Sequence, residues 1–359
     1  MATAEGVRCL YMRGGTSKGA YFLASDLPAD EAERDDLLLR IMGTPDPRQI
    51  DGLGGAHPLT SKVAVVQRSS NNETDVDYLF LQVGVDEAFV TDKQNCGNLL
   101  AAVGPFAVER GLISAGEKTT TVRIRMVNTD SVATATFATP GGRVDYDGDL
   151  AIDGVPGTAG AISLDFEGTA GSSTGALFPT GRVTDEVGGI TVTCVDNGMP
   201  SVLMRAADLG LTGQESPEDL EADKALGQRL SGIRMHAARL MGMGDVSTAT
   251  VPKLVLLSSP TRGGAISTRS FLPVRVHTSI GVLGALTVGA GVLAEGSVGH
   301  ELADLRSGSA RFSIEHPTGY FDVDVAVEAA GEEWQVTRSA ALRTARKLFD
   351  GTVFARPRR

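Results

Sequence analysis

The sequence predicts an α+β protein of two similar lobes, in each of which a mostly antiparallel sheet curls around a central helix. Short runs of alternating hydrophobicity recur along the chain, which is typical of strands with one buried face. Two apolar runs that contain glycine, beginning at Asn95 and Thr278, each follow a strand and are hydrophobic on every side, as helices inside a core are. At 359 residues the chain is long for one core, so two domains are expected.

The first half alternates strands with two helices. Strands are expected at residues 8–12, 61–67, 76–85, 121–129, 133–139 and 142–148. A helix over residues 29–43 begins after Pro28 and ends at Gly43, residue types that often start and stop helices. A second helix over residues 97–111 contains Pro105, which should kink or interrupt it because proline has no backbone N–H.

The second half restarts with further strands and helices. Its strands are expected over residues 190–204, where a turn joins two of them, and over residues 253–259 and 271–277. Between them, residues 216–243 form an amphipathic helical stretch, and a glycine-rich helix begins at Ser279. The domain boundary is expected within residues 178–189, where proline, glycine and charged residues cluster.

Composition and charge exclude several classes of function. The formal net charge of −11 argues against a broad nucleic-acid or membrane surface, because anionic partners would be repelled. The 3 cysteines form neither a disulfide framework nor a metal-ligand pattern, which suits a reducing cytoplasm. The 5 histidines are scattered, so no metal site is expected. The N-terminus lacks a signal-peptide pattern, and the longest apolar run, residues 280–294, is too short to span a bilayer.

A glycine-rich turn, YMRGGTSKGAYF, raises the question of a phosphate-binding loop. Gly14 and Gly19 have the spacing of a Walker-type loop, but Lys18 stands one place too early and no hydroxyl residue follows in the required position. The phosphate interpretation therefore fails. The turn is still rich in N–H and O–H donors, so Thr16 and Ser17 are candidate ligands of a substrate carboxylate. The alternative is an ordinary glycine turn.

Cys96, in the segment QNCGN, is the strongest candidate for a catalytic nucleophile or base. It stands at a helix N-terminus, where unpaired backbone N–H groups stabilise a thiolate. Its neighbours Asn95, Gly97 and Asn98 are polar or small, and they suit an anion-binding nest more than apolar packing. The alternative is a small buried hydrophobic residue, which is the usual role of a free cysteine.

Lys62 is the second catalytic candidate. It stands where an apolar strand begins, after a turn rich in glycine, proline and hydroxyl residues. Strand alternation places it beside the core or a cleft, and a partly desolvated lysine loses proton affinity and becomes a usable general base. The alternative is a solvated lysine at a strand end.

The start of the second apolar helix offers a matching set of anion ligands. Ser279 and Gly281 would supply donors there, and Arg269 would clamp a carboxylate with two parallel hydrogen bonds. For Ser279 the alternative is simple N-capping, and for Arg269 it is a solvated side chain. Two helix starts of this kind favour a ligand held between two lobes.

Six segments stand in order within a match that runs from about residue 8 to residue 353: MRGGTSKGAYF, RQIDGLGGAHPLTSKVAVV, QNCGNLLAAVGPFAVERGL, DNGMP, RSFLPVRVHTSIGVLGA and LRTARKLFDG. Together they resemble the PrpF-type isomerases of the diaminopimelate epimerase-like fold superfamily. The resemblance implies two α/β lobes with the active site at their interface. It also implies that residues 1–184 plus about 336–359 form a first lobe with Lys62 and Cys96, and that residues 185–335 form a second lobe with the helix of Ser279.

The resemblance carries catalytic roles onto Lys62 and Cys96. It assigns carboxylate binding to Asn95, Gly97, Asn98, Ser279 and Gly281, with help from Ser17 and Arg269. The amino-acid epimerases of this superfamily use two facing cysteines, whereas Ser279 stands at the second position here. Its hydroxyl is too basic when ionised to exchange protons with a carbon acid, so a Lys/Cys pair suits allylic proton transfer better than racemisation.

The implied activity is that of a cofactor-free isomerase, which acts on an unsaturated tricarboxylate by keto–enol tautomerisation or allylic proton transfer. Among family members the chain is most similar to those that tautomerise 4-oxalomesaconate in gallate degradation. The 4-oxalomesaconate Δ-isomerases and the methylaconitate isomerases are alternatives, and a non-catalytic carboxylate-binding accessory protein is the alternative from another class. The expected partner is a small tricarboxylate, without nucleic acid, membrane or metal. The oligomeric state stays open, with a homodimer as one arrangement.

Overall fold

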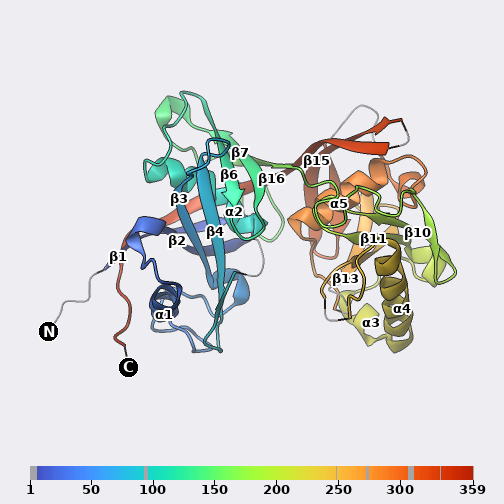
Figure 1. The fold of residues 1–359 in the computed structure, drawn as a ribbon, viewed down its shortest axis with the longest axis horizontal. Coiled ribbons are helices and arrows are strands. Elements are labelled where there is room, and N and C mark those ends of the chain that lie inside the picture. The colour runs from blue at the N-terminus through green and yellow to red at the C-terminus, as the bar shows by residue number, and fades with distance from the viewer. Residues whose placement is uncertain are drawn as a thin grey trace. The chain divides into compact units, whose positions relative to one another are not determined.

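The computed structural model describes residues 6–92, 96–247, 249–271, 275–305, 311–331 and 333–358. The chain divides into two compact units. The first unit ends at Glu167 and resumes at Leu342, whereas the expected division lay after residue 184; the second unit runs from Gly168 to Ala341. Figure 1 draws the chain from blue at its N-terminus to red at its C-terminus. The predicted α+β class is confirmed, since each unit is a sheet with one buried helix.

The first unit is built on a mixed sheet. Its strands are β1 (Val7–Gly14), β2 (Ser17–Leu23), β3 (Lys62–Arg68), β4 (Val76–Val83), β5 (Val90–Thr91), β6 (Thr119–Met126), β7 (Ser131–Ala138), β8 (Ala161–Glu167) and the last part of β16 (Glu333–Val353). From β1 to β7 the pairs β1–β2, β2–β3, β3–β4, β4–β6 and β6–β7 alternate between antiparallel and parallel. The red end of β16 runs antiparallel to blue β1, with Val353 opposite Val7 (Figure 1).

Two helices cover the two faces of this sheet. Helix α1 (Glu31–Met42) begins where the Asp30 side chain accepts a hydrogen bond from Glu33 N at 2.9 Å, and it ends at Gly43 with φ of 80°. Helix α2 (Gly97–Glu109) is buried on nearly every side from Leu99 to Ala107, as expected of a central helix. It continues through Pro105, so of the expected kink or interruption, the interruption was wrong.

Alternation along β3 and β4 sorts side chains onto these faces. The outer face is the side that packs against α1; its core is formed by Val63, Val65, Leu81 and Val83 with Leu38, Ile41 and Met42. The inner face is the side that packs against α2. By the two-residue period of a strand, it carries Lys62 of β3 and Tyr78, Phe80 and Gln82 of β4.

The second unit repeats the strand order of the first. Its strands are β9 (Asp185–Val187), β10 (Ile190–Val195), β11 (Ser201–Arg205), β12 (Lys253–Ser258), β13 (Ile266–Phe271), β14 (Arg311–His316), β15 (Gly319–Ala330) and the first part of β16. From β10 to β15 the pairs are antiparallel, parallel, antiparallel, parallel and antiparallel, the same series as from β1 to β7. The two apolar helices of the sequence therefore occupy equivalent places, since each follows the fourth strand of its series.

The second unit also has helices on both faces. Helix α5 (Val282–Leu293) is the buried one, and Gly291 allows close packing, because a Cβ there would come within 2.5 Å of Leu203. Helices α3 (Pro217–Ala222) and α4 (Lys224–Leu240) pack on the outer face. The single helical stretch expected over residues 216–243 is divided at Asp223, whose side chain accepts a hydrogen bond from Leu226 N and starts α4.

Two expected strands differ from the structure. Residues 142–148 form no strand, because Gly141 and Gly142 take positive φ angles and Asp145 accepts a hydrogen bond from Asp147 N, which makes a turn. The strand expected at 271–277 lies earlier, as β13, and residues 272–274 are outside the described residues. Short 3-10 helices are found at Ala24–Asp26, Pro58–Thr60, Pro140–Gly142, Ala206–Leu209 and His300–Leu302. No helix in the described part of the chain combines the length and apolar character needed to cross a bilayer.

Candidate active site

The glycine-rich turn joins β1 to β2 and is fixed to the C-terminal strand. Gly15, with φ of 47°, donates its N–H to the Thr344 carbonyl at 2.8 Å. Arg13 donates to the Gly15 carbonyl and to the Thr344 hydroxyl, both at 2.9 Å. These bonds hold the turn as a rigid hairpin end instead of a mobile loop.

The first turn of α2 lies directly against this hairpin. Asn98 Nδ2 donates to Thr16 Oγ1 at 3.0 Å, and Thr16 N donates to Asn98 Oδ1 at 3.4 Å. The approach requires glycine, since a Cβ on Gly14 would come within 2.4 Å of the Asn98 carbonyl. The structure therefore brings the predicted ligands Thr16 and Asn98 together, and the Asn98 amide serves first to hold the turn. Asn95 lies outside the described residues.

We expect Gly15→Ala to lower the free energy of unfolding by about 2–3 kcal/mol. The alanine would have to adopt a left-handed backbone conformation, and its Cβ would lie 2.2 Å from Asn98 Oδ1. Gly111→Ala is the matched control: Gly111 has φ of 69° but no atom within 4 Å of the added Cβ. The free energy of unfolding of that variant should fall by only about 1 kcal/mol. Chemical denaturation of both variants measures the difference, and equal losses would contradict the tight packing of the turn on α2.

Ser17 supplies a buried hydroxyl on the inner face. It lies two residues before Gly19, which pairs with Lys62 in the parallel ladder of β2 and β3. Only 2% of Ser17 is exposed, and its Oγ has no hydrogen-bond partner among the described residues. A buried hydroxyl without a partner is costly unless a ligand or water completes it. Ser17 is thus suited to donate to a bound anion.

Cys96 is the N-cap residue of α2 and is 9% exposed. Its carbonyl accepts the first helical hydrogen bond from Leu100 N at 3.0 Å and a second bond from the Tyr78 hydroxyl at 3.4 Å. The N–H groups of the first helical turn have no partner inside the helix, as at any helix start. The Cys96 thiol does not cap them. Burial, and next the nearby Cys96, raise the pKa of Tyr21 and Tyr78, so both phenols stay neutral donors.

Lys62 opens β3 on the same inner face and is 6% exposed. Its Nζ donates to Gln82 Oε1 at 2.7 Å and lies 4.9 Å from the centre of the Phe80 ring. The amine therefore has a defined partner, and it is held over an aromatic face that attracts cations. The alternative of a solvated lysine at a strand end does not describe this residue.

Both catalytic candidates contact the same strand, β4. Lys62 contacts Phe80 and Gln82 of β4, whereas the Cys96 carbonyl contacts Tyr78 of the same strand. Tyr78 and Phe80 point to one face and are two residues apart, which is roughly 7 Å along a strand. The Lys62 amine and the Cys96 carbonyl thus contact the inner face of β4 at points separated by about the length of a small organic acid.

We expect an alkylating reagent at about pH 8 to modify Cys96 much faster than the other two cysteines. Burial raises the pKa of Cys9 and of Cys194 to about 12, so almost none of either thiol is ionised at that pH. Peptide mass spectrometry after short exposure to iodoacetamide measures the modified fractions. Equal labelling of Cys9 or Cys194 in the folded protein would contradict the assignment of Cys96 as the reactive thiol.

In the second unit, Ser279 and Gly281 lie at the start of α5. Gly281 is its N-cap residue, and Ser279 Oγ lies 3.2 Å from Nε2 of the buried His316. Ser279 N donates to His277 Nδ1 at 2.9 Å, which requires an unprotonated Nδ1. Burial, and next the charge of Lys253, lower the pKa of His277 and favour that state. The described residues at the start of α5 therefore include no thiol equivalent to Cys96.

The structure does not bring Arg269 together with Ser279 and Gly281. Arg269 lies two residues before Phe271 on β13, so it shares the face that packs against α3 and α4, on the side of the sheet opposite α5. Its guanidinium donates to the Glu215 carbonyl at 2.8 Å and to the Thr268 carbonyl at 3.0 Å. Burial is the first cause that lowers the pKa of this group. Arg269 thus stabilises the second unit through hydrogen bonds to backbone carbonyl groups, and the expected carboxylate clamp is not supported.

Sequence reasoning missed two polar residues of these sites. Gln82, the partner of Lys62, is one; the other is Lys253, which opens β12 opposite Ser201 just as Lys62 opens β3 opposite Gly19. Burial, and next the charge of Arg234, lower the pKa of Lys253. The signal for Lys253 was present, because PKLVLL repeats the pattern of SKVAVV. No local pattern pointed to Gln82.

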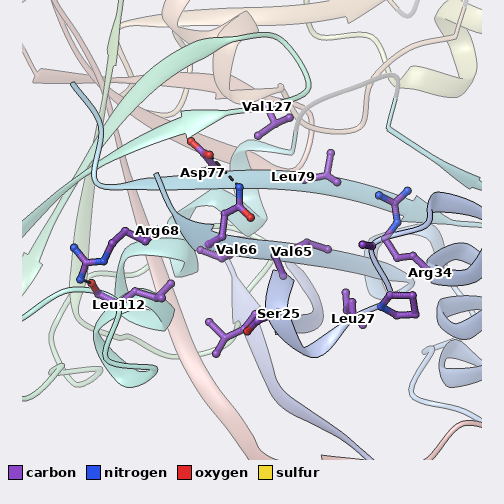
Figure 2. Close-up of a pocket in the computed structure, with 15 residues that line it drawn as sticks. Ser25, Leu27, Arg34, Val65, Val66, Arg68, Asp77, Leu79, Leu112 and Val127 are labelled. Carbon is purple, nitrogen blue, oxygen red and sulfur yellow. Dashed lines mark hydrogen bonds between the residues drawn. The ribbon is translucent and has the colours of Figure 1, made fainter. Parts of the chain in front are cut away.

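Neither catalytic candidate lines the cavity of about 600 Å³ in the first unit (Figure 2). That cavity lies on the outer face, and its lining is mainly apolar, with Val65, Leu79 and Val127 among the labelled residues. A cavity of about 360 Å³ is lined by residues that include Gln82. Within the part of the chain that the structure describes, no three His, Cys, Asp or Glu side chains gather as metal ligands would.

Comparison with known proteins identifies close relatives over the whole length. The PrpF protein family matches residues 5–356. The chain is 56% identical to the (4E)-oxalomesaconate Delta-isomerase of Novosphingobium sp. strain KA1, over 96% of each chain. It is 54% identical to the 4-oxalomesaconate tautomerase of Pseudomonas putida KT2440, over 97% of this chain and 95% of that one. The crystal structure of methylitaconate-delta-isomerase superimposes with a TM-score of 0.90 at 32% identity, covering 98% of this chain and 96% of that chain.

Proposed function

The chain belongs to the PrpF protein family, as its ordered motifs predicted, and we propose that it is an isomerase that moves a proton within 4-oxalomesaconate. One observation carries the proposal: the Lys62 amine and the Cys96 carbonyl both contact the inner face of β4, so the two residues lie within about a small molecule's length of each other. Two relatives that are more than half identical are named for this acid. The Lys62/Cys96 pair supplies what such a reaction needs, namely one group to accept a proton and one to return it.

The proposed reaction requires only proton transfer, because the substrate's own carbonyl and alkene acidify a C–H bond. One member of the pair removes that proton, and the electron pair of the C–H bond enters the conjugated system as a dienolate. The other member then protonates the dienolate, either on oxygen or on a different carbon. Substrate and product have the same atoms, so no electron acceptor is consumed. Preorganised donors that face the dienolate lower the barrier.

Carboxylate binding in the first unit is assigned to four residues. The hydroxyls of Thr16 and Ser17 and the backbone N–H groups of Gly97 and Asn98 lie at the turn and at the start of α2. A helix start carries partial positive charge, which favours an anion there. In the second unit we assign the same role to Ser279 and Gly281 at the start of α5. Arg269 has no part in the proposal.

The experiment is incubation with 4-oxalomesaconate in heavy water, followed by ultraviolet absorbance and proton NMR. Turnover with loss of a carbon-bound proton to solvent is the expected result. Keto–enol tautomerisation leaves the new proton on oxygen, whereas Δ-isomerisation leaves deuterium on a different carbon, so the product spectrum separates the two reactions. Binding of the acid without any exchange would overturn the proposal and identify a non-catalytic carboxylate-binding protein.

We further assign the enzyme to the cytoplasm and to gallate-type aromatic acid degradation. The Cys9, Cys96 and Cys194 thiols are free and buried, which suits a reducing compartment. The degradation of aromatic acids by ring opening produces unsaturated keto acids of the proposed substrate class. Fractionation of cells that express the protein tests the location. Its enrichment outside the cytoplasm would overturn that assignment without affecting the chemistry.

A further inference from the structure

From the geometry around Lys62 we infer that Gln82 is a positioning residue that orients the catalytic amine. This inference rests on the proposed function, since it concerns how Lys62 is made ready for proton transfer. Gln82 Oε1 accepts a hydrogen bond from Lys62 Nζ at 2.7 Å, and the two residues face each other in the antiparallel ladder of β3 and β4. Gln82 is therefore the nearest polar partner that the structure gives the amine.

The Gln82 amide can hold only one orientation. Its Nε2 faces three carbonyl oxygens, those of Ser61 at 2.9 Å, Pro58 at 3.1 Å and Val83 at 3.3 Å. Rotating the amide by half a turn would put its oxygen against these acceptors, and no donor would remain between them. Oε1 must therefore point at Lys62. The hydrogen-bond partners fix this assignment of the amide oxygen and nitrogen.

A second buried glutamine supports the first. Gln49 Nε2 donates to Ser61 Oγ at 2.7 Å, and Gln49 Oε1 accepts from Ala56 N at 2.9 Å. Ser61 and Gln49 are 0% and 1% exposed. The chain of contacts thus runs from the loop before β3 through Gln49, Ser61 and Gln82 to Lys62. A fully satisfied network of this kind holds its members in one arrangement.

These contacts restrict where the Lys62 amine can point. A lysine side chain has four rotatable bonds, and by itself its Nζ would sample many positions. The bond to Oε1 and the Phe80 ring together restrict the position of Nζ. One N–H points to Gln82, so the remaining valences of the nitrogen face away from it. Because proton transfer depends on placement to within about 1 Å, loss of this restraint should lower the rate by about 10²-fold.

The test compares Gln82→Met with Gln67→Met. Gln82→Met keeps the length of the side chain and removes the acceptor. Gln67 pairs with Asp77 across the same two strands but on the outer face, where the bond from Gln67 Nε2 to Asp77 is drawn dashed in Figure 2. The expected result is a fall of about 10²-fold in kcat for Gln82→Met and no change for Gln67→Met.

The split between kcat and KM separates a positioning role from a merely structural one. Gln82 bonds to Lys62 and to backbone carbonyl groups, so its loss should lower kcat and leave KM unchanged. A partial loss of folding would lower the amount of active protein, and kcat per folded molecule would stay at the wild-type value. An unchanged kcat per folded molecule, or equal rate losses in the Gln82 and Gln67 variants, would overturn the inference.

A measurement on the unaltered protein covers the case in which Gln82→Met fails to fold. A crystal structure of the wild-type protein is expected to show Nζ within hydrogen-bond distance of Oε1, and a separation beyond about 3.5 Å would overturn the inference. The two proposals fail differently. Absence of wild-type turnover refutes the proposed function, whereas full turnover with an unaffected Gln82→Met refutes only the role of Gln82.

Discussion

Lys62→Met is expected to lower kcat for 4-oxalomesaconate by about 10²- to 10⁴-fold while the protein remains folded. Methionine keeps an unbranched apolar side chain beside Phe80, whose ring the Lys62 amine overlies, but it carries no exchangeable proton, so one half of the proton-transfer pair is lost. The buried ammonium disappears together with its need for a partner, which keeps the effect on stability small. Steady-state ultraviolet assays and circular dichroism measure the two quantities separately.

Lys18→Met is the matched control for this variant. Lys18 belongs to β2 of the same unit, and its Nζ lies 5.8 Å from the Tyr11 ring centre. It alternates with Ser17 and Gly19, so it points away from the inner face. Its replacement should leave kcat within about twofold of wild type, as expected for a surface substitution. Wild-type turnover in Lys62→Met would refute the catalytic assignment.

Cys96→Ala is expected to cause a loss of similar size, about 10²- to 10⁴-fold in kcat. Cys96→Ser should be nearly as inactive, because a hydroxyl at the same place ionises far less readily than a thiol. Because serine and cysteine are similar in size, the Cys96→Ser variant shows whether the acidity of the thiol, and not only the shape of the side chain, is required. Cys194→Ala is the control, since this core thiol belongs to the second unit and its pKa of about 12 keeps it out of proton exchange. The rate per folded molecule should not change in that variant.

Deuterium exchange in the same variants distinguishes the roles of the two groups. A variant that still exchanges the acidic C–H of the substrate with heavy water, without forming product, retains the base and has lost the donor. If Lys62→Met exchanges and Cys96→Ala does not, Cys96 removes the proton; the reverse result assigns that step to Lys62. Normal product formation in both variants would exclude the pair from the mechanism.

Several features of the site follow from short stretches of sequence. Cys96 was found because a polar and glycine neighbourhood precedes an apolar run, and Lys62 was found because it precedes an apolar strand. Both signals are local, since helix starts and strand starts depend on a few consecutive residues. The buried character of α2 and α5 was also readable, because neither helix has a polar side to expose.

Other features depend on contacts that no local pattern contains. Gln82 is 20 residues from Lys62 in the sequence, and only the pairing of β3 with β4 places the two side chains next to each other. Arg269 is of the residue type expected of an anion clamp, but the register of β13 places it on the face toward α3 and α4. There its guanidinium donates hydrogen bonds to two backbone carbonyl groups. A change of one residue in register would move it to the other face.

The sequence by itself thus determined the class of fold, the family and the residues with reactive side chains. Only the tertiary structure decided which of those side chains share a face and which polar partners hold them. The physical reason is that composition and periodicity are set by neighbouring residues, whereas the face on which a strand presents a side chain is set by pairing with residues far away in the chain. For that reason the Lys62 amine and the Cys96 carbonyl both contact β4, whereas Arg269 lies on the face of its sheet opposite α5.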